Sequence, residues 1–287
     1  MYEITGTTRL TGLLGSPVSH SISPQMHNMA FRLLDLDYVY LAFDVAPSDL
    51  EQAVRALKLL NIRGFNLTMP HKTAILDLVD ELTPAAVLAN AVNTVTNENG
   101  HLIGHTTDGI GYMRSVEDAG FSVIGKKMTL LGAGGAATAI CTQAALDGVS
   151  SIDMFKRQNA SWPEALAFAK RVTDATDCKV TLYDIADTTQ LKHSIEESAI
   201  LTNATNVGMA PNTSFTPIPT ELLDPHIIVS DIIYNPRETR LLHDAKQIGC
   251  PVMNGLYMLL YQGAASFECW TNHEMPVADI KANYFLT

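Results

Sequence analysis

The spacing of apolar residues along the chain alternates between two periods. Short apolar runs typical of buried strands are followed by segments in which apolar residues recur at helical spacing. In the first half, the predicted strands are 10–15, 38–43, 64–68, 91–96 and 101–104, and the predicted helices are 24–34, 48–61, one that begins at Pro70, and 108–119. Residues 98–100 separate the last two strands and predict a hairpin. The alternation predicts open, mostly parallel sheets with helices on both faces.

A second α/β region begins at Lys127. Its predicted strands are 127–131, 151–155, 180–182, 199–203 and 227–233, with helices at 137–148 and 166–173 among them. The turn Gly132-Ala133-Gly134-Gly135-Ala136 lies between a strand and a helix. Glycines there allow a tight bend and let the backbone approach a pyrophosphate at the helix N-terminus. This context favours a dinucleotide-binding turn over a purely structural one.

The end of the next strand bears on which dinucleotide binds. An acidic residue at that position would hold the ribose hydroxyls of NAD, and an arginine would hold the extra phosphate of NADP. The sequence has Lys156, Arg157 and Asn159 there, with no acid, and Asp153 lies inside the strand. The residues therefore allow NADP or use of both dinucleotides.

Two ionisable residues, Lys72 and Asp108, stand where strands or loops turn into predicted helices. Pro70 is expected at the first position of its helix, so Lys72 would lie in the first turn, where the helix dipole disfavours an ammonium. Asp108 starts another helix, where the dipole favours a carboxylate. Because the helix dipole would disfavour the charged form of Lys72 and favour that of Asp108, the two residues form a candidate proton-transfer pair. The alternative is an N-capping aspartate and a solvated lysine.

A third corner carries two serines, Ser21 and Ser23, directly before Pro24. Ser23 is expected as the N-cap of the helix, with Pro24 at its first position. Hydroxyls beside helix N–H groups can bind a small anion such as a carboxylate. Simple capping would explain Ser23 but not Ser21.

Composition narrows the class of protein. With 287 residues, 47% of them hydrophobic and 17% charged, the chain is typical of a globular protein of one or two domains. The net charge of -11 argues against a nucleic-acid or anionic-membrane surface. There is no membrane-length apolar run, no signal pattern at residues 1–4, and no metal-type spacing of the four cysteines or nine histidines. We therefore expect a cytoplasmic protein with reduced cysteines and no metal.

The motifs together resemble the shikimate dehydrogenase family. The matching segments cover nearly the whole chain, and they are 15–24, 66–72, 91–94, 107–109, 132–136, 203–209, 231–236 and 255–262. Residues 136–140 and the pair Trp270-Thr271 look closer to the quinate/shikimate branch. The resemblance implies a substrate-binding domain of residues 1–109 and about 261–287, and a Rossmann-like domain of residues 110–260.

It also implies reversible oxidation of shikimate to 3-dehydroshikimate with NAD or NADP, in the pathway to chorismate and the aromatic amino acids. Lys72 and Asp108 match the catalytic pair. The other matching positions bind substrate (Ser21, Ser23, Thr68, Asn93, Tyr234 and Gln262) or the dinucleotide (residues 132–136, Lys156, Arg157, Asn159, Thr205, Gly255 and Met258).

Some positions depart from the family pattern. Thr106 stands where the family usually has asparagine, and the turn at 156–159 matches neither the NAD nor the NADP type in full. The branch resemblance favours NAD. Quinate adds one hydroxyl, which a permissive pocket rejects poorly, so use of quinate, even a quinate-preferring catabolic role, stays open. A non-catalytic dinucleotide sensor and a folate-type dehydrogenase fit the Lys72, Asp108 and serine positions less well. The chain is expected as a monomer or homodimer.

Overall fold

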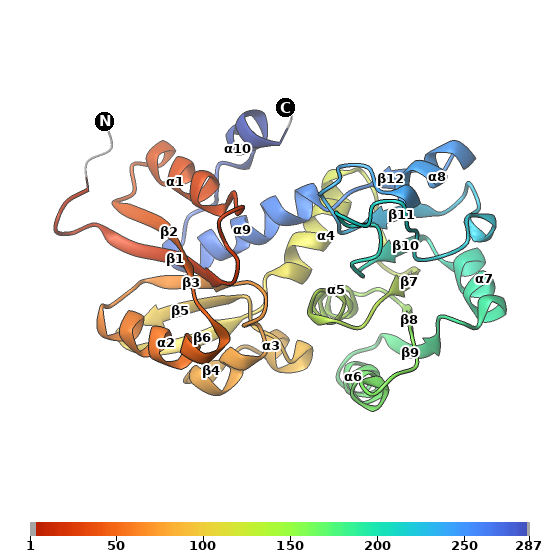
Figure 1. Ribbon diagram of the computed structural model, residues 1–287, viewed down its shortest axis with the longest axis horizontal. Coiled ribbons are helices and arrows are strands. Elements are labelled where there is room, and N and C mark those ends of the chain that lie inside the picture. The colour runs from red at the N-terminus through yellow and green to blue at the C-terminus, as the bar shows by residue number, and fades with distance from the viewer. Residues whose placement is uncertain (1–3, 286–287) are drawn as a thin grey trace. The chain divides into compact units, whose positions relative to one another are not determined.

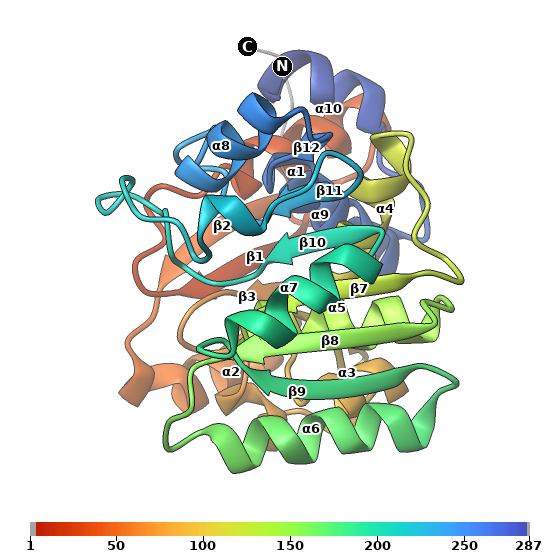
Figure 2. The same cartoon turned by 90° about the vertical axis from the view of Figure 1, so that its right-hand side faces the viewer.

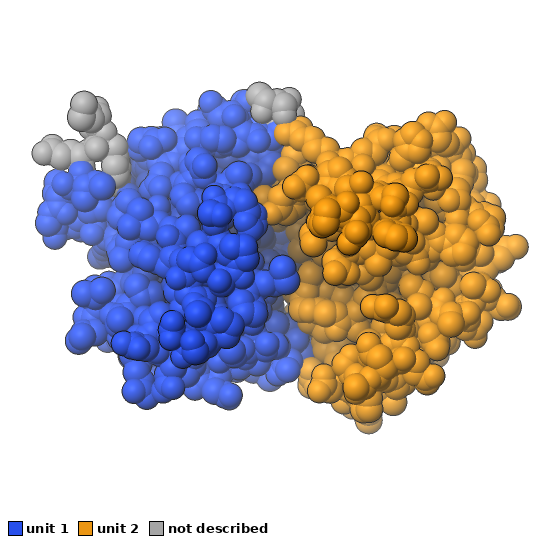
Figure 3. Space-filling model, in the orientation of Figure 1, with its two compact units in different colours: residues 1–111, 260–287 blue, residues 112–259 orange. Residues whose placement is uncertain are grey.

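The structure, a computed structural model that describes residues 4–285, divides the chain into two compact units (Figure 3). Unit 1 is Met1–Gly111 with Leu260–Thr287, and unit 2 is Tyr112–Leu259. The ligand that each unit binds stays a prediction. Residues 1–3, on which most of the expected lack of a signal rests, lie outside the described residues. No helix within 4–285 is long and apolar enough to cross a membrane.

Unit 1 contains a six-stranded mixed sheet (Figure 1). Three of its five strand pairings are parallel, and β5 runs antiparallel to both of its neighbours, which confirms the predicted hairpin of β5 and β6. The strands in spatial order are β2 (Tyr38–Asp44), β1 (Arg9–Gly15), β3 (Gly64–Leu67), β5 (Thr94–Glu98), β6 (His101–His105) and β4 (Glu81–Leu82).

Helices pack beside this sheet because each carries an apolar face. In α2, Leu50, Val54 and Leu57 are buried in one core cluster with residues of β1 and β3, whereas Leu60, expected on the same side, follows the last helical residue and is exposed. The helices that lie wholly or partly in unit 1 are α1 (Ser23–Leu33), α2 (Leu50–Leu59), α3 (Pro84–Ala89), α4 (Asp108–Asp118), α9 (Leu256–Thr271) and α10 (Val277–Tyr284), with 3-10 turns η1 (Pro47–Asp49) and η2 (Ala74–Leu78).

The helix predicted to begin at Pro70 is wrong. Residues 69–73 form turns, and only the 3-10 turn η2 follows them. The backbone N–H of His71 donates to the Thr68 carbonyl, and the Lys72 carbonyl accepts a hydrogen bond from the Val92 N–H at 2.8 Å. Because that carbonyl bonds to a neighbouring segment, it is not available to a helical N–H four residues further on. Lys72 is therefore held by a turn rather than by the first turn of an α-helix.

Unit 2 contains a six-stranded, fully parallel sheet, which Figure 2 shows almost face on. Its strand order is that of the Rossmann fold. The strands are added in one direction from β7 to β9 and then in the opposite direction from β10 to β12, so the order reverses between β7 and β10. The strands in spatial order are β9 (Lys179–Asp184), β8 (Ser151–Lys156), β7 (Lys127–Leu131), β10 (Ile200–Asn203), β11 (Ile228–Asp231) and β12 (Val252–Met253). The expected fold class is confirmed.

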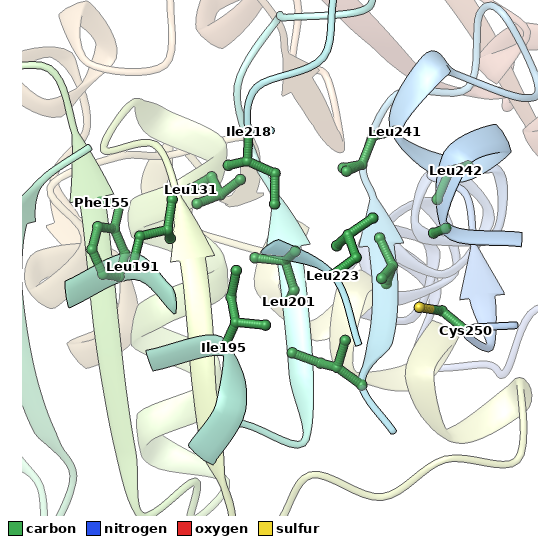
Figure 4. Close-up of a cluster of buried hydrophobic side chains, with 13 residues drawn as sticks. Leu131, Phe155, Leu191, Ile195, Leu201, Ile218, Leu223, Leu241, Leu242 and Cys250 are labelled. Atoms are coloured by element: carbon green, nitrogen blue, oxygen red, sulfur yellow. The ribbon is translucent and has the colours of Figure 1, made fainter. Parts of the chain in front are cut away.

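Leucine and isoleucine side chains from strands and helices fill one core of unit 2 (Figure 4). Leu131 and Leu201 on the central strands pack with Leu191 and Ile195 on α7, and with Leu241 on α8. The glycine-rich turn therefore starts from a rigid strand end. The helices of this unit are α5 (Gly135–Leu146), α6 (Trp162–Ala175), α7 (Thr188–Glu197) and α8 (Arg240–Ile248), with the 3-10 turn η3 (Thr220–Leu222).

Candidate active site

Lys72 and Asp108 form an ion pair in unit 1. The Nζ atom of Lys72 donates to Oδ2 of Asp108 at 2.6 Å. Asp108 is the first residue of α4, as predicted, and its side chain is 10% exposed, whereas that of Lys72 is 25% exposed. The lysine is therefore partly open to solvent and could reach a reacting group. The more buried aspartate fixes its position through the hydrogen bond.

The second carboxylate oxygen of Asp108 is also held. The Nδ2 atom of Asn93 donates to Oδ1 of Asp108 at 2.9 Å, and Oδ1 of Asn93 accepts a hydrogen bond from the Thr107 N–H at 2.6 Å. Nδ2 of Asn93 also lies 3.4 Å from Oε1 of Gln262 on α9. The structure thus brings together four of the predicted site residues, Lys72, Asp108, Asn93 and Gln262, through side-chain hydrogen bonds.

The serine corner differs from the expected capping arrangement. Ser23 is the first helical residue of α1 and Ile22 is the N-cap, so Ser23 does not cap the helix. The Ser21 hydroxyl accepts the Ser23 N–H at 3.2 Å, which is a turn rather than a cap. No side chain caps α1 among the described residues. The Ser23 N–H is bonded to Ser21, Pro24 has no N–H, and the Met26 N–H donates to the Ile22 carbonyl, so in the first turn the Gln25 N–H stays available to an anion.

A cavity of about 410 Å³ opens beside Ser21. Ser21 is half-buried and lines it, whereas Ser23 is buried and does not. Thr68, half-buried at the end of β3, donates its N–H to the Leu14 carbonyl. Among these described residues, Thr68 and the two serines form no hydrogen bond with Lys72 or Asp108. The cavity lining is Val18, Ser19, Ser21, Pro24, Gln25, Ala42 and Asp44.

The glycine-rich turn of unit 2 has open backbone at the start of α5. Gly132 has φ +112°, and a Cβ atom there would lie 2.9 Å from the Ala204 carbonyl oxygen. A Cβ on Gly134 or Gly135 would meet nothing within 4 Å. Gly134 is the N-cap of α5 and has no side chain that could accept the free N–H groups. These N–H groups and this empty space fit the pyrophosphate of a dinucleotide.

At the end of β8, the two basic residues differ in their contacts. Nζ of Lys156 donates to Oδ1 of Asn159 at 2.7 Å and lies 5.5 Å from the centre of the Trp162 ring. Arg157 is exposed and forms no ion pair with any described residue. Asp153 is buried, and its Oδ2 lies 2.8 Å from Nζ of Lys127. Asp153 is therefore not available to ribose hydroxyls, in agreement with its position inside the strand.

Buried polar groups order the loops that follow β10 and β11. Asp231 accepts hydrogen bonds from Asn203 Nδ2 (3.1 Å) and Thr239 Oγ1 (2.7 Å), and Thr205 donates its hydroxyl to Oδ1 of Asn203 at 2.7 Å. Burial raises the pKa of Asp231 to about 6, against the opposing effect of these hydrogen bonds. The sequence analysis assigned a role only to Thr205, although polar residues at the ends of apolar strands were a signal for the others.

The remaining predicted residues of unit 2 follow β11 and β12 in the chain. Tyr234 is 42% exposed. A Cβ at Gly255 would overlap the Ile232 carbonyl, so only glycine fits there, and Met258 on α9 is buried. Among the described residues, no group of three or more His, Cys, Asp or Glu side chains is placed to hold a metal ion.

Sequence reasoning also missed a polar cluster in the core of unit 1. Its members are nearly or fully buried, and their signal in the sequence is polar residues at strand or helix positions that otherwise face the core. They are Tyr40, Asn66, Thr94, Thr107 and Ser266.

Comparison with known proteins places the chain among dehydrogenases. The family described as "Shikimate dehydrogenase substrate binding domain" matches residues 13–95, and "Shikimate 5'-dehydrogenase C-terminal domain" matches residues 255–282. "Shikimate dehydrogenase (NADP(+))" of Listeria monocytogenes serotype 4b is 52% identical over 99% of this chain and 98% of that protein.

Two solved structures are similar over almost the whole chain. The crystal structure of shikimate 5-dehydrogenase from Listeria monocytogenes in complex with shikimate and NAD has 52% identity and a TM-score of 0.93, and the match covers 97% of each chain. Quinate dehydrogenase from Corynebacterium glutamicum in complex with NAD has 27% identity and a TM-score of 0.85, over 96% of this chain and 98% of that one.

Proposed function

This chain belongs to the shikimate dehydrogenase family, and from that membership we propose that it interconverts shikimate and 3-dehydroshikimate with a nicotinamide dinucleotide. The observation that carries the proposal is the Lys72–Asp108 pair, with its 2.6 Å contact and partly exposed lysine. A dehydrogenase that oxidises an alcohol needs a group that takes the hydroxyl proton, and this pair supplies one.

During oxidation Lys72, as the free amine, accepts the proton of the reacting hydroxyl and becomes the ammonium that pairs with Asp108; during reduction the ammonium returns that proton. Asp108, held through both carboxylate oxygens, orients the lysine and balances its charge. Asn93 and Gln262 adjoin this pair and are the proposed contacts to ring hydroxyls. Thr68 and Tyr234 are the other proposed substrate contacts.

The substrate carboxylate is assigned to the serine corner. Ser21 presents its hydroxyl to the cavity beside the start of α1, where the Gln25 N–H is open and the buried Ser23 lies next to it, and the helix dipole there favours a negative charge. Hydrogen bonds from neutral hydroxyl and N–H groups suit a small acid without the desolvation cost of a buried arginine.

The chain's own residues fit a dinucleotide. When bound, its nicotinamide exchanges hydride with the carbon that bears the reacting hydroxyl. Residues 132–136 and the free N–H groups of α5 would hold the pyrophosphate, because Gly132 permits the positive φ of the turn and no side chain fills the space beyond Gly134. Thr205, Gly255 and Met258 are the proposed contacts nearer the nicotinamide.

Between the two dinucleotides, we infer a preference for NADP. Arg157 is exposed and without an acidic partner, and no carboxylate stands at the end of β8 to bind ribose hydroxyls. Lys156 and Asn159 bond to each other and flank that position. The preference for NAD that the branch resemblance predicts is the competing outcome, and the following rates separate the two.

The test measures initial rates with shikimate and quinate, each with NAD and NADP. We expect the highest kcat/KM for shikimate with NADP. Arg157→Ala should lower kcat/KM for NADP about 10-fold and leave that for NAD within about twofold, because only the extra phosphate loses its bidentate partner. Arg55→Ala, an exposed arginine of unit 1, is the control. Turnover with none of the four pairs would contradict the function, and an unchanged NADP rate in Arg157→Ala would contradict the cofactor assignment.

Quinate is the second candidate substrate. It is shikimate with water added across the ring double bond, which places a hydroxyl on the carbon that carries the carboxylate, and the cavity of about 410 Å³ beside Ser21 offers space there. Since a pocket rarely excludes one added hydroxyl by more than about 100-fold, we expect quinate turnover within that factor of the shikimate value. A larger ratio would rule quinate out as a substrate.

A further inference from the structure

Ser266 lies at the centre of the buried polar cluster in unit 1. It stands on α9, one helical turn after Gln262, and its side chain is fully buried. Its hydroxyl donates to the Gln262 carbonyl at 2.9 Å. Because a hydroxyl has one proton and two lone pairs, this oxygen can accept hydrogen bonds from two of the other polar groups near it at a time.

Three further groups converge on that oxygen. Nδ2 of Asn66 donates to it at 2.9 Å, and the hydroxyl oxygens of Thr94 and Thr107 lie 2.8 Å and 3.1 Å away. Thr94 and Thr107 are themselves 3.1 Å apart. These three groups come from β3, β5 and the segment before α4, so Ser266 ties helix α9 to three separate parts of unit 1.

Thr107 connects this cluster to the proton-transfer pair. Its Oγ1 lies 2.9 Å from Nδ2 of Asn93 and 3.2 Å from Oδ1 of Asn93. Nδ2 of Asn93 in turn donates to Asp108, whose other oxygen holds Lys72. A continuous series of hydrogen bonds therefore runs from Ser266 to Lys72.

We propose that Ser266 is a positioning residue, which fixes Thr107 and Asn93 and thereby the orientation of Asp108 and Lys72; the proposal rests on the proposed shikimate dehydrogenase activity. Full burial excludes contact between Ser266 and a substrate. Its effect must pass through its neighbours. Small errors in the placement of a catalytic group can cost up to about 100-fold in rate, so such support carries functional weight.

The other possible role for a buried serine is to satisfy polar groups during folding. Ser266→Ala would leave Asn66 Nδ2 with two other acceptors, the Asn93 carbonyl at 3.1 Å and the Thr94 hydroxyl at 3.0 Å. The variant is therefore expected to fold. Ser194→Ala in unit 2 is a matched control, because Ser194 is also fully buried and bonds to a threonine, Thr129, at 2.8 Å.

The first measurement compares kcat and KM for shikimate in the wild type and both variants. Ser266→Ala should lower kcat about 10-fold with KM changed by less than about threefold, since the proton-transfer geometry is disturbed more than binding. Ser194→Ala should match the wild type in both. Equal kcat in all three proteins, with an active wild type, would overturn the positioning role without affecting the proposed function.

A double-mutant cycle tests the route. Thr107→Val removes the hydroxyl that joins Ser266 to Asn93 and keeps the side-chain shape. If Ser266 acts through Thr107, the fold-reduction of kcat in the double variant should be no more than about twice that in the more impaired single variant. Multiplied losses, about 100-fold for two 10-fold effects, would show independent action and overturn the proposed route. An inactive wild type would instead refute the underlying function.

Discussion

His27 predicts a measurable loss of stability in mild acid. Its side chain, on α1, is fully buried and stacks on Tyr40 with ring centres 4.4 Å apart. Within the described residues, neither ring nitrogen has a hydrogen-bond partner. Burial lowers the pKa of His27 from 6.5 to about 3, because the charged ring would lose its hydration without gaining a partner. The folded protein therefore holds this histidine neutral.

The sign and size follow from proton linkage. Below pH 6.5 the unfolded chain binds a proton at His27 that the folded chain refuses, so the free energy of unfolding falls as the pH drops from 6.5 towards 3. Between pH 7.5 and pH 5, this one group should remove about 2 kcal/mol. That is a large share of the stability of a typical domain.

Urea unfolding at pH 7.5 and pH 5 tests this for the wild type and His27→Phe, which keeps a flat ring against Tyr40 but cannot titrate. The variant's free energy of unfolding should fall about 2 kcal/mol less over that pH change. His193→Phe, on the exposed surface of α7, should follow the wild type. Equal losses in the wild type and His27→Phe would refute the reasoning.

Three other predictions concern single side chains. Lys72→Ala should lower kcat at least about 100-fold with shikimate binding, measured by calorimetry, nearly unchanged; normal turnover would contradict its role. Gly132→Ala should raise the dissociation constant of the dinucleotide and lower the free energy of unfolding by about 1–3 kcal/mol, because its Cβ would lie 2.9 Å from the Ala204 oxygen. A dissociation constant equal to that of the wild type would contradict this. Lys127→Met leaves the buried carboxylate of Asp153 unpaired and should cost about 3 kcal/mol in urea unfolding, and a cost under about 1 kcal/mol would contradict this.

Much of the fold followed from local patterns. All strands of the two sheets except the two-residue β4 and β12 were predicted, as were the hairpin of β5 and β6 and the start of α4 at Asp108, because apolar period and turn residues act over a few positions. The helix at Pro70 failed for the opposite reason. The Lys72 carbonyl bonds to Val92, twenty positions later in the chain, and no local pattern around Pro70 encodes that contact.

The site shows the same division. Lys72, Asp108 and the glycine turn stand in recognisable motifs, so their positions could be predicted. The role of Ser266 could not, because a serine in an apolar helix signals a buried polar group but not its partners, and Asn66 and Thr107 are far away in sequence. Only the assembled sheet reveals that these polar side chains meet.

The distribution of the site between the units has a consequence for how such an enzyme could be altered. The ion pair, its supporting amides and the serine corner all belong to unit 1, whereas the glycine turn and Arg157 belong to unit 2. Substitutions at the end of β8 can therefore change the preferred dinucleotide without touching any atom that handles the proton. Cofactor choice and substrate choice become two separately adjustable properties, for natural selection and for an engineer alike.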